Sequence, residues 1–318
     1  MRRILSLPVL LALLVLVIVF PVAGAHTVTV WSGDMDGWAI RTSDDGTPPN
    51  TASVTFVPGP ATPPLGTGSA QLSVGTNGAS GAELRQSDYA GTALAAVTDL
   101  SYWTYIATPG SGGQAPYIIL AVDLDADGGW DDLLFFEPGY QDGSYAGDPV
   151  PDQGSVTAGT WQQWDARAGG WWSLNAGTFG PPLVTLDTYV AANPTATLVN
   201  QSAGGGIRFV AGFGAGAWDN FVGNIDAVVI GTSHTTTYDF EVAGLATPAP
   251  TPTPTPATEA DPTAAPTPTA AEETPALTTA LLPDTATDKG PLTLSLLALA
   301  AVSAVGGTVA WMRRRGRA

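Results

Sequence analysis

The chain has 318 residues and contains no cysteine, which excludes disulfide bonds, thiolate catalysis and cysteine-based zinc sites. Residues 26–285 hold all of the 28 acidic residues except Asp288, which leaves 27 acidic side chains against four arginines and a net charge near −23. Such a charge excludes nucleic acid as an expected partner, because phosphates are repelled. It tolerates divalent cations and neutral sugars, and it also keeps an exposed domain soluble. The four arginines are Arg41, Arg85, Arg167 and Arg208.

The first 25 residues predict a secretory signal peptide. Arg2 and Arg3 precede an apolar run, Ile4–Phe20, and the small residues Ala23 and Ala25 suit a signal-peptide cleavage site, so cleavage is expected after Ala25. Because the apolar run is long, an uncleaved signal anchor is the alternative.

Residues 26–245 predict one all-β ectodomain. Short runs of alternating apolar and polar residues recur between Gly, Pro and Asp turns, as in Ala52–Val57. Many short strands of this kind are typical of a β-sandwich, and we expect a jelly-roll-like one. One short helix is expected at Leu186–Ala192, stopped by Pro194. The expected strands are Thr27–Trp31, Ala52–Val57, Ala70–Val74, Ala82–Arg85, Ser101–Ile106, Tyr117–Val122, Leu133–Phe136, Gly206–Gly212, Phe221–Ile230 and Thr235–Phe240.

The sharpest local motif is Asp-x-Asp-x-Asp-Gly-x-x-Asp, whose carboxylates alternate along a tight loop with Gly128 at the turn. Calcium takes several oxygen ligands, so this spacing predicts a structural calcium site that pins the hairpin Tyr117–Phe136. The motif resembles the hairpin calcium loops of integrin-type β-propeller repeats. The predicted ligands are Asp123, Asp125, Asp127 and Asp131.

Three points qualify the calcium hypothesis. Leu134 stands where an EF-hand loop would carry its glutamate, so the motif is not an EF-hand. Asp132 is either a spare ligand or an outward strand residue. The alternative for the whole motif is an ion-free acidic turn, because Asp and Gly are common turn formers.

Four tryptophans form the second candidate site. Trp161 and Trp164 flank two glutamines, and Trp171 and Trp172 follow two glycines. Their rings could stack on sugar faces while amides bind the hydroxyls, although adjacent residues of a strand point to opposite faces, so the four cannot share one platform. The alternative is that they are core residues of the sandwich.

Several segments resemble bacterial carbohydrate-binding-like and concanavalin-like β-sandwiches. Gly33–Trp38 is similar to the beginning of such modules, Gly66–Leu72 to their second edge, and Phe221–Gly231 with Tyr238–Glu241 to their last strands. The residues Pro58–Gly66 are similar to a segment of uncharacterised secreted bacterial proteins with the same ending. The resemblance implies a fold more than a function, because sandwiches host many activities.

Polar residues of the last strands and the histidines offer little chemistry. Asn224 and Asp226 are either ligands or turn-stabilising side chains. Neither His26 nor His234 has a credible nucleophile nearby in the sequence, and no catalytic residue is predicted. The glutamates of the domain do not form the Glu-x-Asp-x-x-Glu motif of laminarinase-type glucanases. They are Glu83, Glu137 and Glu241.

Residues 246–281 predict a stalk. They are rich in Pro, Thr and Ala and have too little apolar bulk to form a core. Regular prolines favour an extended polyproline II chain of about 3.1 Å per residue, which would lift the ectodomain away from an anchor. The threonines could carry glycans.

The chain ends with the three parts of an anchoring signal. Leu282-Pro283-Asp284-Thr285-Ala286 precedes an apolar run, Leu292–Met312, which is long enough to cross a bilayer, and a basic tail at 313–318 would stay cytoplasmic. This order resembles the sorting signal of sortase-anchored wall proteins, with Ala286 where glycine is commonest. The resemblance implies that a sortase-like transpeptidase cuts Thr285–Ala286 and joins the chain to peptidoglycan. A plain single-pass membrane anchor is the alternative.

We therefore expect a non-enzymatic module, displayed on the outside of the cell, that binds an extracellular glycan or another surface protein. A structural coat component with no small ligand is one alternative. A glycoside hydrolase or lyase is another, since aspartates distant in sequence could pair in space.

Overall fold

The computed structural model describes residues 26–43, 50–111, 113–201 and 205–243. The predicted signal peptide, stalk, sorting motif and C-terminal apolar run lie outside the described residues. Among the helices of the described part, none is long and apolar enough to cross a membrane.

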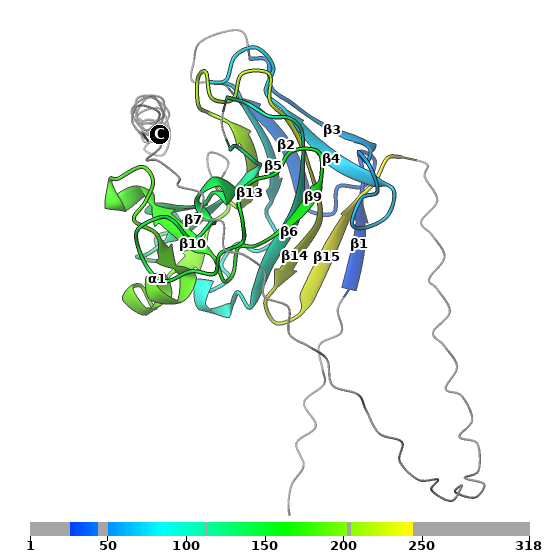
Figure 1. The fold of residues 1–318 in the computed structure, drawn as a ribbon. Helices are drawn as coiled ribbons and strands as arrows, with labels where there is room; N and C mark the ends of the chain where they lie inside the picture. The colour runs from blue at the N-terminus through cyan, green and yellow to red at the C-terminus, as the bar shows by residue number, and fades with distance from the viewer. Residues whose placement is uncertain (1–25, 44–49, 112, 202–204, 244–318) are drawn as a thin grey trace, which may run out of the picture.

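The described residues form two β-sheets, which confirms the predicted all-β class and is consistent with a β-sandwich (Figure 1). Sheet I contains β1 (His26–Val30), β3 (Ser53–Pro58), β4 (Gly68–Ser73), β6 (Asp99–Thr108), β9 (Trp161–Asp165), β14 (Val222–Gly231) and β15 (Thr235–Phe240). Sheet II contains β2 (Trp38–Ser43), β5 (Gly81–Gln86), β7 (Tyr117–Asp123), β8 (Asp132–Phe136), β10 (Gly170–Ser173), β11 (Val184–Thr185), β12 (Thr197–Leu198) and β13 (Ile207–Gly212).

The long strand β14 organises sheet I. On one side it pairs with β6, whose other neighbour is the edge strand β9. On its other side it pairs first with β4, through Val222–Ile225, and then with β15, through Val228–Gly231. A register shift after Asp226 separates the two halves, and Ala227 there has a φ of 47°. β1 lies parallel to β15, so the first and last described strands are neighbours.

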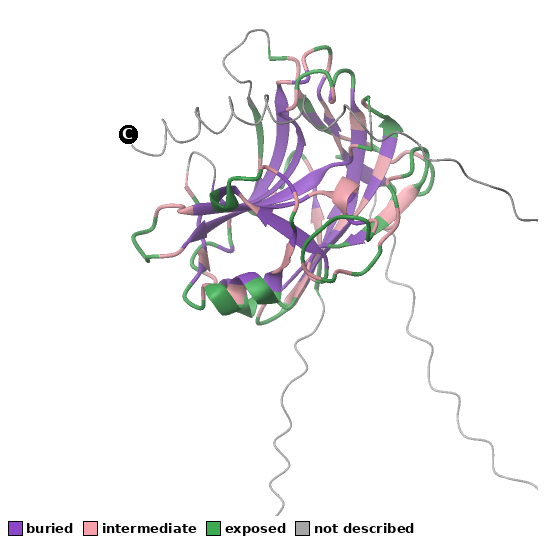
Figure 2. Cartoon of the chain, turned by 60° about the vertical axis from the view of Figure 1, so that its left-hand side comes forward, coloured by how far each residue is buried: buried purple, intermediate pink, exposed green. Residues whose placement is uncertain are grey.

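The core lies between the two sheets because alternate side chains of each strand point into it. Trp38 of sheet II packs its ring 5.1 Å from that of Tyr238 and 5.2 Å from that of Phe240, both in sheet I. Tyr102 of sheet I packs 5.2 Å from Phe209 of sheet II. Buried residues accordingly follow the facing strands, whereas exposed residues lie in turns and on the outward side of the helix (Figure 2).

The predicted helix is confirmed as α1 (Leu186–Ala192). The Oγ1 atom of Thr185 caps its first turn by accepting a hydrogen bond from the backbone N–H of Thr188 at 3.1 Å, and the helix ends before Pro194. Three single 3₁₀ turns complete the helical residues. They are η1 (Leu94–Ala96), η2 (Pro138–Tyr140) and η3 (Leu174–Ala176).

Each sheet also has an outer face, turned away from the other sheet. In sheet I, Tyr102 faces the core, so its neighbours Trp103 and Ser101 belong to the outer face. In sheet II, Phe209 faces the core, so Arg208 belongs to the outer face. The charged, polar and aromatic residues that could form a functional site lie on these two outer faces and in the β7–β8 turn.

Candidate functional site

The acidic motif forms the β7–β8 turn, in which Asp123 organises the backbone. Its Oδ1 accepts hydrogen bonds from the N–H groups of Asp125 (3.0 Å) and Ala126 (2.7 Å), and its Oδ2 accepts one from Gly128 (2.9 Å). Burial alone would raise the pKa of Asp123, but the backbone N–H groups outweigh it and hold this pKa below its ordinary value. Asp123 is therefore a carboxylate at neutral pH. Ala126 and Gly128 both have positive φ, which curls the turn around it.

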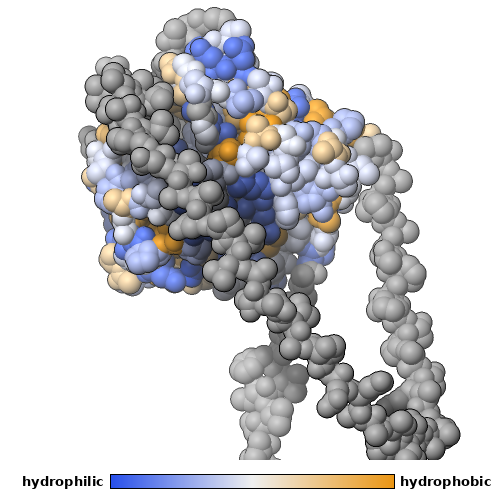
Figure 3. Space-filling model, viewed as in Figure 1, coloured by the Kyte–Doolittle hydropathy of each residue, from blue (hydrophilic) through white to orange (hydrophobic). Residues whose placement is uncertain are grey.

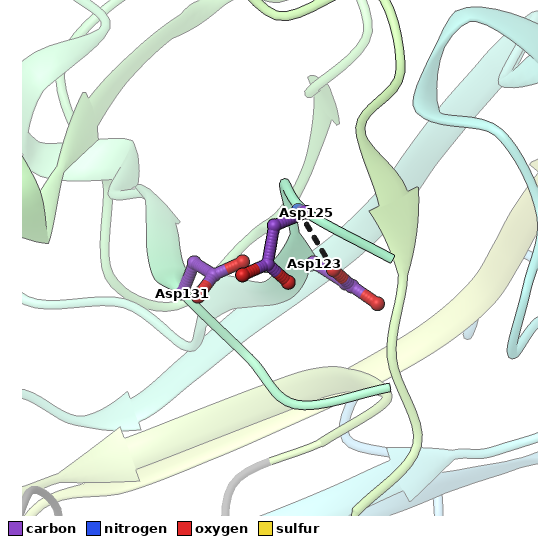
Figure 4. Close-up of side chains that lie close together, drawn as sticks. All are labelled: Asp123, Asp125 and Asp131. Carbon is purple, nitrogen blue, oxygen red and sulfur yellow. Dashed lines mark hydrogen bonds between the residues drawn. The ribbon is translucent and has the colours of Figure 1, made fainter. Parts of the chain in front are cut away.

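Three of the four predicted metal ligands come together in this turn. Asp123, Asp125 and Asp131 each offer an oxygen, and these oxygens lie within 4.8 Å of one another, so the group could hold a metal ion. The carboxylates of Asp125 and Asp131 point toward each other (Figure 4). The predicted ligand Asp127 is outside this group: it is exposed, and its Oδ1 accepts a hydrogen bond from the N–H of Gly129 at 2.6 Å.

Asp132 is neither a spare ligand nor an outward residue, and both interpretations are corrected. It is buried, and its Oδ2 accepts hydrogen bonds from the hydroxyl groups of Ser173 (2.5 Å) and Tyr189 (2.8 Å). Its Oδ1 accepts one from the N–H of Asn175 at 3.1 Å. Asp132 thus joins β8 to β10, η3 and α1.

The prediction of a sugar-binding role is wrong for three of the four tryptophans, because their rings are buried. Trp164 donates its Nε1 hydrogen to Thr104 Oγ1 at 2.8 Å, and Trp171 donates to the carbonyl of Ala166 at 2.9 Å. Trp172 stacks on Phe135 with ring centroids 3.9 Å apart. These three are packing residues, as the alternative interpretation had it.

Trp161 differs, because it is only half-buried and lies on the outer face of sheet I. Its register partner on β6 is Tyr105, and the next outer pair is Trp103 with Gln163. The rings of Trp161 and Tyr105 are 5.6 Å apart. Trp103, Tyr105 and Trp161, which we call the aromatic platform, are all half-buried, and Gln163 beside them is exposed.

The predicted polar residues of β14 are buried on the same outer face. The Nδ2 group of Asn224 donates a hydrogen bond to Ser69 Oγ at 2.9 Å. The carboxylate of Asp226 accepts hydrogen bonds from the N–H groups of Leu65 (3.1 Å) and Phe240 (3.2 Å). Both side chains therefore hold structure together, and Asp226 fastens the β3–β4 loop, residues 59–67, to the sheet.

Sequence reasoning missed a cluster of charged residues on the outer face of sheet II. Arg208 is 1% exposed and Arg85, its register partner on β5, is 3% exposed. They share one carboxylate, Glu83, at 3.9 Å and 3.4 Å. Within the part of the chain that the structure describes, Nε of each arginine and Nη2 of Arg208 have no hydrogen-bond partner. Two buried guanidinium groups thus face one acid, an excess of positive charge that water does not solvate.

Glu137 is the second missed residue of chemical interest. It follows β8 directly, and its Oε1 accepts a hydrogen bond from the indole N–H of Trp172 at 2.9 Å. Burial raises the pKa of Glu137 to about 7, although the Trp172 N–H opposes the rise. The signal that could have found the outer face of sheet II is the scarcity of arginine. Of the four arginines in residues 26–285, Arg85 and Arg208 lie at paired positions within buried strands.

The described part of the chain also has a cavity of about 270 Å³, and its lining contains no ionisable side chain. In the space-filling view, apolar residues form small separate spots, and strongly hydrophilic surface occupies the hollow in the middle of the view (Figure 3).

The sequence matches no protein-family model, and no curated protein matches it.

Proposed function

We propose that the chain is a non-enzymatic binding module displayed on the outside of the cell, and that it binds an extracellular glycan. The aromatic platform carries this proposal. Trp103, Tyr105 and Trp161 present three half-buried rings on one face of two neighbouring strands, and the exposed amide of Gln163 lies in the same row as Trp103.

The chemistry of the platform suits a sugar. The apolar C–H face of a pyranose packs against aromatic rings, and amide oxygen and nitrogen atoms accept and donate hydrogen bonds to its hydroxyls. A neutral glycan is also compatible with an ectodomain that carries four arginines against a large excess of acids. Another surface protein as partner, or a coat role with no small ligand, is the competing outcome.

Calcium at the β7–β8 turn belongs to this proposal as a structural element. Asp123, Asp125 and Asp131 supply converging oxygens, and oxygen ligands are those that calcium prefers. The bound ion would cancel the mutual repulsion of the three carboxylates and fix the β7–β8 hairpin. It would take no part in sugar recognition, which we place on the other sheet.

The remaining segments of the chain determine where the ectodomain is displayed. Residues 1–25 direct export, residues 246–281 form a stalk, and residues 282–286 with the apolar run 292–312 anchor the chain through a sortase-like transpeptidase or directly in the membrane. In this proposal, the β-sandwich is a jelly roll. Each of these roles rests on the sequence patterns described above.

A glycan array tests the binding role. We expect the wild-type protein to be retained by one glycan class and the Trp161→Ala variant to lose at least nine-tenths of that signal. Tyr145, an aromatic residue 40% exposed elsewhere on the surface, provides the matched control, and Tyr145→Ala should bind like the wild type. If Trp161→Ala binds glycan at the wild-type level, or if the wild type binds no glycan, the proposal that the platform binds a glycan is refuted.

A second candidate function, cleavage of an acidic glycan, is favoured by one specific arrangement. Glu137, with its pKa near 7, is suited to proton transfer at neutral pH. The same outer face of sheet II carries the buried guanidinium groups of Arg85 and Arg208, whose positive charge would favour an acidic substrate. Product release from uronate-containing polysaccharide by the wild type, absent from Glu137→Gln, would establish this function. No release by the wild type would remove it.

A further inference from the structure

The two histidines of the chain, His26 and His234, lie at the same end of sheet I. β1 begins at His26, whose register partner on the neighbouring parallel strand β15 is Thr236 (Figure 1). His234 precedes Thr236 by two residues, in the short turn 232–234 that joins β14 to β15. Neighbouring strands lie about 4.8 Å apart and rise about 3.3 Å per residue, so ideal strand spacing puts the two histidine Cα atoms about 8 Å apart.

The two histidine side chains also belong to the same face of the sheet. Tyr238 of β15 faces the core, and Val28 of β1 is its register partner. Because side chains alternate along a strand, His26 shares the face of Val28, and His234, one step beyond Thr236, shares the face of Tyr238. Both histidines are exposed, since they lie where the sandwich ends. Two accessible imidazole rings are thus neighbours on one face.

The β14–β15 turn orients the ring of His234. The turn is closed by the backbone N–H of Thr232, which donates a hydrogen bond to the carbonyl oxygen of His234 at 2.9 Å. The hydroxyl oxygen of Ser233 lies 3.2 Å from Nδ1 of His234. This contact engages Nδ1 and leaves Nε2 as the nitrogen that can bind a metal. Such a division of the two ring nitrogens is usual for metal-binding histidines, because the hydrogen bond fixes the ring.

Export would add a third nitrogen atom at this place. The inference rests here on the export signal of the proposed function, because cleavage after Ala25 makes His26 the first residue of the exported chain. The free α-amino group and Nδ1 of His26 can then chelate one metal ion. Because β1 is parallel to β15, the backbone nitrogen of His26 lies on the side of that residue that is nearer to His234.

We propose that the α-amino group and Nδ1 of His26, together with Nε2 of His234, form a copper(II) site of the exported protein. Copper(II) accepts planar sets of nitrogen ligands and binds them more tightly than the other divalent first-row metals do. Calcium prefers oxygen ligands and is not expected here. The site lies on the core side of sheet I, whereas the aromatic platform lies on its outer face and the β7–β8 turn belongs to sheet II.

Copper titration of the exported, purified protein tests the site, after mass spectrometry has identified the first residue. With glycine present to remove weakly bound copper, we expect a chain that begins at His26 to bind one copper(II) ion and to show nitrogen splitting in its EPR spectrum. His234→Ala should weaken copper binding at least tenfold and leave the metal-free Tm unchanged, because this side chain is exposed. Thr235→Ala, next in the chain and on the opposite face, is the matched control and should bind copper like the wild type.

Acetylation tests the α-amino group separately. Lys289 is the only lysine of the chain, so in Lys289→Arg acetic anhydride leaves the α-amino group as the one acetylated amine. The acetylated protein should bind copper at least tenfold more weakly than the same protein before acetylation.

Two results overturn the proposal, and they can be told apart. If the chain begins at His26 but binds copper no more tightly than His234→Ala or the acetylated protein, the copper site fails and the export signal stands. If the exported chain begins at another residue, the site and the predicted cleavage fail together. Glycan binding enters neither measurement, so failure of the glycan proposal leaves both results readable.

Discussion

The indole N–H of Trp161 donates a hydrogen bond to the carbonyl oxygen of Pro60 at 2.9 Å, and so joins the edge strand β9 to the β3–β4 loop. The same loop is fastened at its other end by Asp226, which accepts a hydrogen bond from Leu65. The loop is therefore held at one end by the aromatic platform and at the other end by β14. A change at Asp226 that releases the loop should also loosen Trp161.

The β7–β8 turn is predicted to lose stability when its ion is removed. Because chelation leaves three carboxylates within one turn with no cation between them, we expect Tm to fall by several degrees in chelator, and by less in Asp125→Asn, where one repelling charge is gone. Differential scanning calorimetry measures both. Asp127→Asn, outside the group, should retain the wild-type response. An identical Tm with and without chelator in every protein would exclude calcium from the turn.

Asp132 is predicted to be one of the costliest polar residues to remove. Asp132→Ala leaves the hydroxyls of Ser173 and Tyr189 without their acceptor in a buried place, so the free energy of unfolding should fall by about 3 kcal/mol. Urea denaturation followed by tryptophan fluorescence measures this. The exposed Asp34→Ala should change it by less than about 0.5 kcal/mol, and a similarly small effect at Asp132 would contradict the assigned role.

The acidic motif of the β7–β8 turn and the neighbouring Asp132 show what sequence alone could and could not establish. The Asp123–Asp131 motif is local, so its spacing was enough to predict a turn with converging carboxylates. Asp132, next to it, depends on Ser173 and Tyr189, which are distant in the sequence, and its role was not predictable. The same limit applies to Arg85 and Arg208, because strand pairing and not sequence spacing brings them together.

The strands illustrate a second limit. Alternation predicted a strand at Ala52–Val57, which the structure has at Ser53–Pro58, because only one face of it is buried. It missed β9 and β10, where large tryptophans occupy both faces. Trp171 packs near Phe136 on the core side, while Trp172 stacks on Phe135 on the outer side, so both are buried and no alternation remains. A second buried layer on the outer face erases the pattern.

Glu137 is predicted to make stability depend on pH. Its pKa is about 7 in the folded protein and ordinary in the unfolded chain, so the folded state holds the proton more tightly. The resulting stabilisation is complete at low pH, and it is lost as the pH rises from about 4.5 through about 7. After a discount for partial exposure it amounts to roughly 1–2 kcal/mol.

Comparison of Glu137→Gln with the wild type isolates this contribution, because the variant cannot ionise. We expect the free energy of unfolding, measured by urea denaturation, to fall less between about pH 5 and pH 8 in the variant than in the wild type. Asp226 and Asp239 titrate in the same range but are present in both proteins, so they cancel in the difference. A difference that is constant across this range would show that Glu137 does not titrate there.

The anchoring signal gives a prediction that does not depend on the described fold. Thr285 stands at the position after which a sortase-like transpeptidase cuts, so Thr285→Ala should prevent covalent attachment and leave the chain extractable by detergent. Immunoblots of wall and detergent fractions measure the distribution. Thr287→Ala, two residues beyond the cut and outside the motif, is the matched control and should remain in the wall fraction. If wild type and both variants are all extracted by detergent, the C-terminal run is a plain membrane anchor; if Thr285→Ala stays in the washed wall, attachment does not pass through this threonine.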